Sequence, residues 1–135
     1  MRMDLLNPEG WAAPKGYANV VRVSGGHQQV FIAGQVAWNE RQELVGAGDF
    51  AAQFRQALSN VLACLTTAGG APTDLASVTI YVTDKQQYLG ASRELGTLWK
   101  ELVGRHWPAM ALVQVADLLE DGALVEIQAV ACIAA

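Results

Sequence analysis

The residue with the clearest capacity for chemistry is Glu126, a carboxylate in a run of small and apolar residues near the end of the chain. If this run is a strand, Glu126 and Gln128 share one face, while Val125 and Ile127 share the other. A carboxylate among apolar neighbours indicates either a solvated edge or a lined cleft, and the residues alone leave both interpretations open. In a cleft, Glu126 can act as a general base toward water. An interface carboxylate satisfied by backbone amides is the structural alternative.

The other reactive residue types are too sparse for the common metal and catalytic sites. His27 and His106 are far apart and neither begins a ligand spacing, so we expect no bound metal and no cofactor. Cys64 and Cys132 lie in periodic apolar segments, which predicts buried, reduced thiols. Residues Gly46–Ala51 match the dinucleotide pattern G-x-G-x-x-A, but an acidic residue would stand where the pyrophosphate binds. A turn followed by a helix cap is the better interpretation.

Two further groups of residues could contact a ligand, and each has a structural explanation. The four tryptophans could form a ligand wall, but we expect them to fill the core or an interface; they are Trp11, Trp38, Trp99 and Trp107. The pair Arg105-His106 could bind an anion. A cation at the C-terminal end of a helix explains this pair equally well.

The composition of the chain bounds its architecture and its partners. A length of 135 residues corresponds to one domain, spanning residues 1–135. Charged residues make up 16%, against about 25% in an average protein, so a monomer would leave apolar surface in water and we expect a homo-oligomer. The net charge of −4 argues against nucleic-acid binding. No membrane helix or signal peptide is evident, which predicts a cytoplasmic protein.

The first half of the sequence predicts strands followed by a helix. Residues 17–23 and 29–33 are β-branched and aromatic runs separated by Ser24–Gln28, which is typical of a hairpin turn. A third strand is expected from Gln35 to about Trp38, resuming near 43–45. From residue 50 the apolar period becomes helical and continues to about residue 68. Asp49 is the expected N-cap, and Gly69-Gly70 supplies the left-handed C-terminal residue.

The second half of the sequence predicts a strand, a helix and two further strands, which together with the first half indicate the fold class. Residues 78–82 alternate as a half-buried strand, and Asp84 with Gln87 forms a capping-box pattern. One face of a second helix is marked by Tyr88, Ala91, Leu95, Leu98 and Leu102. Two strands, at about 109–116 and 124–133, end the chain. The order βββαβαββ predicts an α+β fold, with a mainly antiparallel sheet, two helices on one face and subunit contacts on the other.

The order of landmarks along the chain is similar to that of a known family. These landmarks are Gly16-Tyr17, Ala33-Gly34-Gln35-Val36, Asp49 with Gln53 and Arg55–Leu58, Thr79–Asp84, Pro108-Ala109, Leu112–Val115 and Leu124–Ala131. Taken together at these spacings, they resemble the RidA/YjgF family of reactive-intermediate deaminases, also labelled translation inhibitors or endoribonucleases. The likeness covers about residues 14–133.

This resemblance implies a chorismate-mutase-like (YjgF) fold assembled as a homotrimeric barrel, with clefts between neighbouring subunits. In active members the cleft holds a small imine or enamine and hydrolyses it to a ketone and ammonia without a cofactor. An arginine directly after the Pro-Ala pair binds the substrate carboxylate. A glutamate on the last strand helps to position and activate water.

Carried over position by position, the family glutamate falls on Glu126, the cleft tyrosine on Tyr17 and the ligand-facing glycine on Gly34. A polar position on the second helix falls near Ser92. The arginine position is occupied by Met110, which is followed by Ala111, and a position that is frequently cysteine falls on Leu112. A thioether carries no charge and cannot make a bidentate contact with a carboxylate, so the main anion-binding group of the family is missing.

We therefore expect an arginine-lacking RidA-like homotrimer that binds a small metabolite and hydrolyses an imine, enamine or related C–N bond, with Tyr17 and Glu126 as its catalytic residues. The missing arginine argues against typical 2-imino acid deamination. Arg105 or His106 is a candidate replacement. A non-catalytic ligand-binding or protein-interaction trimer is the alternative function. Ribonuclease activity is a third, disfavoured by the acidic charge balance.

Overall fold

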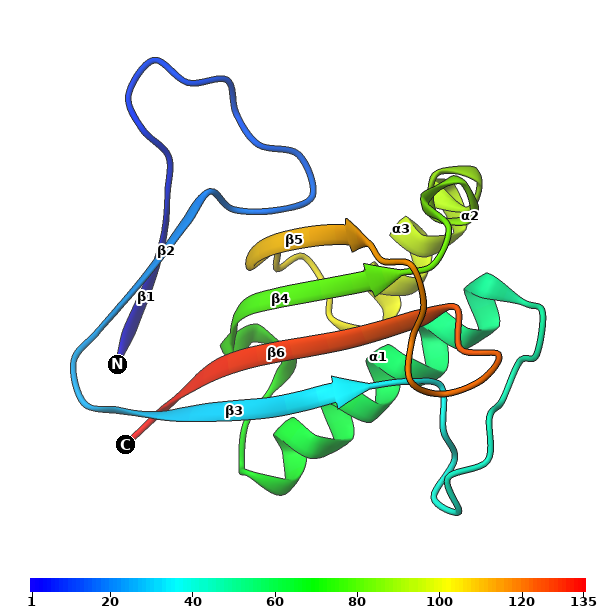
Figure 1. Ribbon diagram of the computed structural model, residues 1–135. Coiled ribbons are helices and arrows are strands. Elements are labelled where there is room, and N and C mark those ends of the chain that lie inside the picture. Colours follow the sequence, from blue (N-terminus) through cyan, green and yellow to red (C-terminus); the bar gives the residue numbers. More distant parts are fainter.

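Four strands rich in β-branched and apolar residues form the central sheet of the computed structural model, which describes residues 1–135 (Figure 1). They are β3 (His27–Gln35), β4 (Leu75–Val82), β5 (Ala109–Gln114) and β6 (Val125–Ala134), in the spatial order β3-β6-β4-β5. Strand β6 is antiparallel to both of its neighbours, and only β4 and β5 run parallel. The expected mainly antiparallel sheet is confirmed.

The helices lie behind this sheet in Figure 1, on a single face of it. They are α1 (Phe50–Thr67), α2 (Lys85–Gly90) and α3 (Ser92–Leu102), with a short 3-10 turn, η1, at Pro72–Asp74. The carboxylate of Asp49 accepts a hydrogen bond from the Ala52 amide, and Gly69 adopts a φ of +90°, so both predicted ends of α1 are confirmed. None of the helices is long and apolar enough to cross a membrane.

The core lies between the helices and one face of the sheet. Helix α1 contributes Phe54, Leu58 and Val61, and α3 contributes Leu98 and Trp99. The sheet contributes a row of fully or nearly fully buried side chains: Val78, Ile80, Val82, Val125, Ile127, Ala129 and Ala131. Because side chains alternate along a strand, this packing leaves the intervening residues, including Glu126, on the uncovered face.

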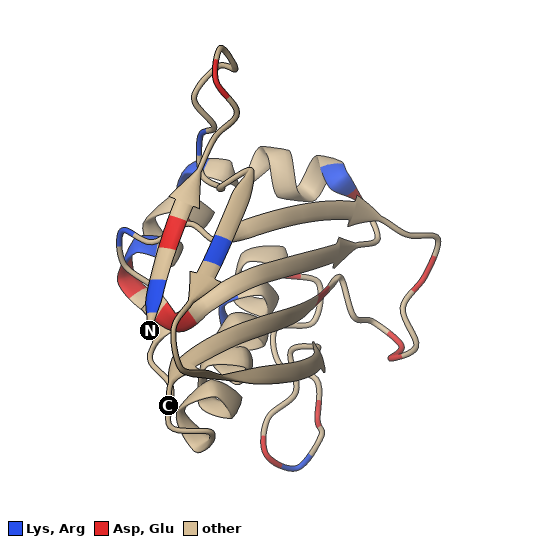
Figure 2. Ribbon diagram, turned by 90° about the vertical axis from the view of Figure 1, so that its left-hand side faces the viewer, with Lys and Arg blue, Asp and Glu red and all other residues tan.

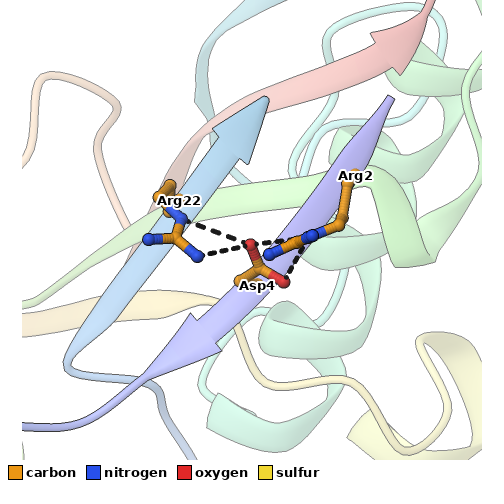
Figure 3. A network of polar contacts seen from close by, with 3 residues as sticks. All are labelled: Arg2, Asp4 and Arg22. Atoms are coloured by element: carbon orange, nitrogen blue, oxygen red, sulfur yellow. Dashed lines mark hydrogen bonds and ion pairs between the residues drawn. The ribbon is translucent and has the colours of Figure 1, made fainter. Parts of the chain in front are cut away.

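Strands β1 (Arg2–Leu6) and β2 (Val20–Ser24) form a separate antiparallel ribbon. Across it, Arg2 and Arg22 both donate to the carboxylate of Asp4, with N–O distances of 2.9 and 3.0 Å (Figure 3). The hydrogen bond from Arg22, reinforced by Arg2, holds the pKa of Asp4 below its usual value. Both arginine side chains are exposed, so this network fixes the strand register more than it stabilises the fold.

Several expected elements differ from the observed ones. Strand β1 was not predicted, and β2 pairs with it instead of forming a hairpin with β3. The expected third strand at 35–38 and 43–45 is only a single bridge between Trp38 and Leu44. The expected second helix is broken at Ala91 into α2 and α3. The α+β class is confirmed; the order βββαβαββ is matched with α2 and α3 counted as one helical segment, but the unpredicted β1 takes the place of the expected third strand.

Candidate functional site

Glu126 and Gly34 lie side by side on the uncovered face of the sheet. A β-bulge interrupts the pairing of β3 with β6 between Ile32 and Gln35, and Gly34 lies within it. A Cβ atom added to Gly34 would collide with the carboxylate of Glu126, at 2.9 Å from its Cδ atom. Only glycine lets the β3 backbone come this close to the acid. The carboxylate of Glu126 makes no side-chain hydrogen bond or ion pair within the chain.

The apolar surroundings of Glu126 come from the same strands. Glu126 stands opposite Tyr81 of β4, and Tyr81 stands opposite Val113 of β5, so the three side chains form one row across the sheet. Glu126 is the one Asp, Glu, Lys or Arg residue in the four strands. Figure 2 accordingly shows these strands almost entirely without charge. Part of the predicted setting of Glu126 is therefore present: it is an acid on an otherwise uncharged strand face.

Tyr17 lies at the edge of the sheet, beside β5. The Ala18 amide donates to the Pro108 carbonyl at 2.9 Å and Ala18 bridges Ala109, which fixes Tyr17 next to this strand. A cavity of about 210 Å³ opens here. It is lined by Lys15, Gly16, Tyr17, Ile80, Tyr88, Met110, Ala111 and Leu112. The structure thus brings together three predicted site residues from two distant segments.

A second, inner cavity of about 130 Å³ adjoins the first, and both are lined by Gly16, Ile80, Tyr88 and Met110. Ser92 of α3 also lines the inner cavity. The remaining lining is mostly apolar and comprises Phe54, Leu95, Gly96, Trp99 and Trp107. Ser92 therefore joins the group around Met110, and Trp107 serves both the core and the cavity wall. A cavity of this lining suits an apolar group of a small molecule.

The predicted site residues form two groups on opposite faces of the sheet. Met110 and Leu112 stand opposite the buried residues Val78 and Ile80, on the helix-covered side. Glu126 stands opposite Tyr81, on the uncovered side. A single chain does not place the carboxylate of Glu126 in the cavity that contains Tyr17.

The two candidate replacements for the missing arginine lie elsewhere. His106 is buried, and its Nε2 atom forms a 2.7 Å hydrogen bond with the Leu75 carbonyl, so it serves the fold. Arg105 is exposed and lines none of the cavities described above. The cation nearest the outer cavity is Lys15, on its exposed rim.

Other predicted features have mixed outcomes. Gly46 and Gly48 have φ angles of +75° and +74° directly before the α1 cap, which confirms the turn and cap in place of a dinucleotide motif. Cys132 is buried and its burial raises the pKa of its thiol, but Cys64 lies on the outer side of α1 and is exposed. The expectation of two buried thiols was therefore wrong for Cys64. No group of three or more His, Cys, Asp and Glu side chains is placed to hold a metal.

The residue that the sequence reasoning missed is Tyr88. Its helical spacing marked it only as part of a core face, yet its side chain lines both cavities. The ring is held edge-on by Phe50, with centroids 6.5 Å apart at 90°. A polar atom on an otherwise apolar helix face was the signal available in the sequence.

An α+β chain with a mainly antiparallel sheet, helices on one face and an uncovered apolar face on the other is a fold of the YjgF type. The sequence profile of the family described as Endoribonuclease L-PSP matches residues 10–133. This chain belongs to that family, the RidA/YjgF family.

Individual relatives agree along nearly the whole chain. It is 30% identical to the 3-aminoacrylate deaminase RutC of Acinetobacter baylyi over 131 residues, or 97% of this chain and 98% of the relative. The crystal structure of YyfB, a Rid-family protein of unknown function from Yersinia pestis, superposes with a TM-score of 0.83 at 33% identity, covering 98% and 100% of the two chains. The structure of E. coli TdcF with bound serine superposes with a TM-score of 0.69 at 26% identity, covering 91% of each chain.

Proposed function

We propose that three copies of the chain form a ring in which Glu126 and Gly34 of one copy face the Tyr17 cavity of the next. The cleft between them binds a small metabolite and hydrolyses its C=N or enamine bond. The observation that carries this proposal is the separation of two groups of residues within one chain. The acid, Glu126, lies on one face of the sheet, and the cavity lined by Tyr17 and Met110 lies on the other, so neither group forms a complete site by itself. Contact between copies is the arrangement that unites them.

The uncovered sheet face supports assembly. Phe31 is 74% exposed and Val113 is 41% exposed, on a face whose strands have a single charged residue. Apolar side chains in such an arrangement favour burial against another protein surface. Burial would also remove bulk water from Glu126, and a desolvated carboxylate acts more strongly on a nearby proton.

The reaction balances with this chain's residues and water alone. Glu126 accepts a proton from a water molecule as the water oxygen attacks the imine carbon; the electron pair of the C=N bond moves to nitrogen, and Glu126 passes that proton to it, which gives a carbinolamine. Glu126 next accepts the hydroxyl proton of the carbinolamine and passes it to the amino group, so that the C=O bond forms, the C–N bond breaks, and a ketone and ammonia are released. In this proposal the Tyr17 hydroxyl donates a hydrogen bond to the ligand, which lies against the Gly34 backbone beside the acid.

Met110 narrows the class of substrate. The family's arginine contributes a charge-assisted hydrogen bond to the substrate carboxylate, worth about 1.5–3 kcal/mol. With a thioether in its place, a 2-imino acid loses about ten- to a hundredfold or more in binding. We therefore propose an imine or enamine with an apolar or aromatic group as the substrate. The deaminase activity in the name of the Acinetobacter relative and the serine bound to TdcF support a small nitrogen-bearing metabolite.

Substitution Glu126→Gln tests the proposal. The variant and the unaltered chain are given a panel of imines and enamines generated in solution, and release of ammonia or ketone is followed. We expect the substitution to reduce turnover at least 100-fold while the oligomer stays intact by light scattering. Asp121→Asn, which removes an equal charge from an exposed loop, is the control and should have no effect. Equal turnover by Glu126→Gln and the unaltered chain would exclude the catalytic role.

The second candidate function is ligand binding without catalysis. It is favoured by the presence of Met110 at the position where the family has its substrate-binding arginine. The same panel distinguishes the two: binding of a small molecule with no turnover above the Glu126→Gln level indicates a binding protein. Ribonuclease activity has less support, because the chain has 13 acidic against nine basic residues and a nucleic-acid site needs clustered positive charge.

A further inference from the structure

Tyr88 is the polar side chain that faces both cavities at the sheet edge. It lies on α2, a single short helix whose position is fixed at its N-terminus. The Asp84 carboxylate accepts from the Gln86 amide at 2.9 Å, and the Lys85 amide donates to the Gln114 side chain at the end of β5, also at 2.9 Å. Phe50 contacts the ring edge-on from α1. The N-terminus of α2 is therefore fixed by its own cap and by β5, and the tyrosine ring is contacted by α1.

The hydroxyl of Tyr88 makes no hydrogen bond to the protein. The side chain is half-buried, and burial raises the pKa of its hydroxyl, so this group stays protonated and neutral at physiological pH. A neutral phenol can donate one hydrogen bond, and a partly buried donor without a partner gains when a ligand supplies an acceptor.

The surroundings of Tyr88 favour an acceptor without charge. Met110 and Ile80 flank it in both cavities. The indole N–H of Trp99 is already bonded to the His106 carbonyl at 2.9 Å. The ammonium of Lys15 belongs to an exposed side chain on the rim, where water solvates it. An ionised ligand group placed beside Tyr88 would lose its hydration without meeting an opposite charge.

We infer that Tyr88 is a specificity-determining residue: its hydroxyl donates a hydrogen bond to an uncharged carbonyl, amide or ester oxygen of a ligand whose apolar group occupies the inner cavity. This inference rests on the proposed function, because it assigns the ligand chemistry of the same site. It gives the site a neutral polar anchor where other members of the family use an arginine.

Three probes of one shape test the inference by calorimetry: phenylacetamide, phenylacetate and ethylbenzene. The unaltered chain should bind the amide more tightly than the carboxylate. Tyr88→Phe, which keeps the ring, should weaken amide binding about tenfold and leave ethylbenzene binding unchanged. Thr97→Val removes a hydroxyl from the outer side of α3 and is the matched control. Met110→Arg should reverse the preference and favour phenylacetate.

Results of two kinds would overturn the inference. One is equal affinity of Tyr88→Phe and the unaltered chain for phenylacetamide, or no binding of any probe to the unaltered chain. The other is tighter binding of phenylacetate that is lost in Lys15→Gln, which would assign the anchor to Lys15. These results are distinct from failure of the proposed function, which is measured as turnover at Glu126 and does not depend on the hydroxyl of residue 88.

Discussion

Glu126 owes its position to a glycine on the neighbouring strand. The β3 bulge brings the Gly34 backbone against the carboxylate, and any side chain there would meet the Oε2, Cδ and Cγ atoms of Glu126. The carboxylate is at the flexible end of its side chain, so it can rotate away at a cost of about 0.5–1.5 kcal/mol. Position 34 therefore controls where the acid points more than whether the chain folds.

Gly34→Ala should separate these two properties. We expect the free energy of unfolding to change by less than about 1.5 kcal/mol, since a rotamer change relieves the clash. We expect turnover on any substrate found to fall more than tenfold, because the carboxylate no longer reaches the reacting atoms. Gly26→Ala is the matched control: its added Cβ meets only Ala135, at an ordinary 3.6 Å. Turnover unaffected by Gly34→Ala would contradict the importance of this close approach.

At the scale of single residues, the sequence indicated the setting of Glu126 better than it indicated which candidate site residues lie together in one chain. The apolar neighbours of Glu126 in the sequence correctly indicated an acid on a strand face without other charges. Its separation from Tyr17 and Met110 was not predicted, because the face on which β5 presents Met110 depends on the register between β4 and β5. Tyr88 was missed because an aromatic residue at helical spacing is, by pattern alone, a core residue.

At the scale of the elements, the buried side-chain amide of Gln53 connects α1 to the start of β6, the strand that contains Glu126. Gln53 is fully buried; its Nε2 atom donates to the carbonyls of Gly46 and Gly122 at 3.2 and 3.0 Å. Its Oε1 atom accepts from the Leu124 amide at 2.8 Å. One side chain thus joins the loop before α1 to the loop that leads into β6, two residues ahead of Glu126.

Gln53→Leu should lower the free energy of unfolding by about 1–3 kcal/mol, because it leaves the Gly122 carbonyl and the Leu124 amide without a partner beside a fully buried side chain, while the Gly46 carbonyl still accepts from the Asp49 amide. Urea denaturation at a fixed protomer concentration measures this change. Gln86→Leu, at an exposed position on α2 whose side chain makes no hydrogen bond, is the control and should shift stability by less than about 0.5 kcal/mol. Similar losses in both variants would show that Gln53 has no special role.

Elements with local signals were predicted well, and those that depend on distant partners were not. The cap at Asp49 and the left-handed Gly69 fixed both ends of α1, and the alternation in β6 was correct. Strand β1 was missed because Arg2 and Asp4 interrupt its apolar pattern and its partner lies about 20 residues away. The helix break at Ala91 has only Gly90 as its signal. Gln87, expected to complete a capping box, instead has a buried Oε1 atom with no hydrogen-bond partner.

At the scale of the whole molecule, the two faces of the sheet have different roles. The helices cover one face, and the β1–β2 ribbon lies apart from the sheet, beyond one end of its strands (Figure 1). On the uncovered face, Phe31 of β3 and Val113 of β5 are exposed at opposite edges of the sheet, with Glu126 between them. Contact with a second copy along this face would cover both apolar residues and enclose the acid.

Phe31→Glu tests this assembly directly. A charge on the uncovered face would have to be buried against apolar surface in the oligomer, so we expect dissociation to monomers by size-exclusion chromatography with light scattering. Leu119→Glu is the matched control, because Leu119 is 100% exposed in the loop before β6 and lies outside the sheet. It should leave the oligomer intact.

Phe31→Glu also connects the molecule's assembly to its chemistry. If Glu126 of one copy completes the Tyr17 cavity of another, the dissociated variant should lose turnover even though each chain keeps its helices, strands and cavities. Circular dichroism establishes that the fold is retained, and turnover is compared at equal protomer concentration. A monomeric variant that keeps full activity would show that each chain contains a complete site, because the two groups of residues would then be acting without contact between copies.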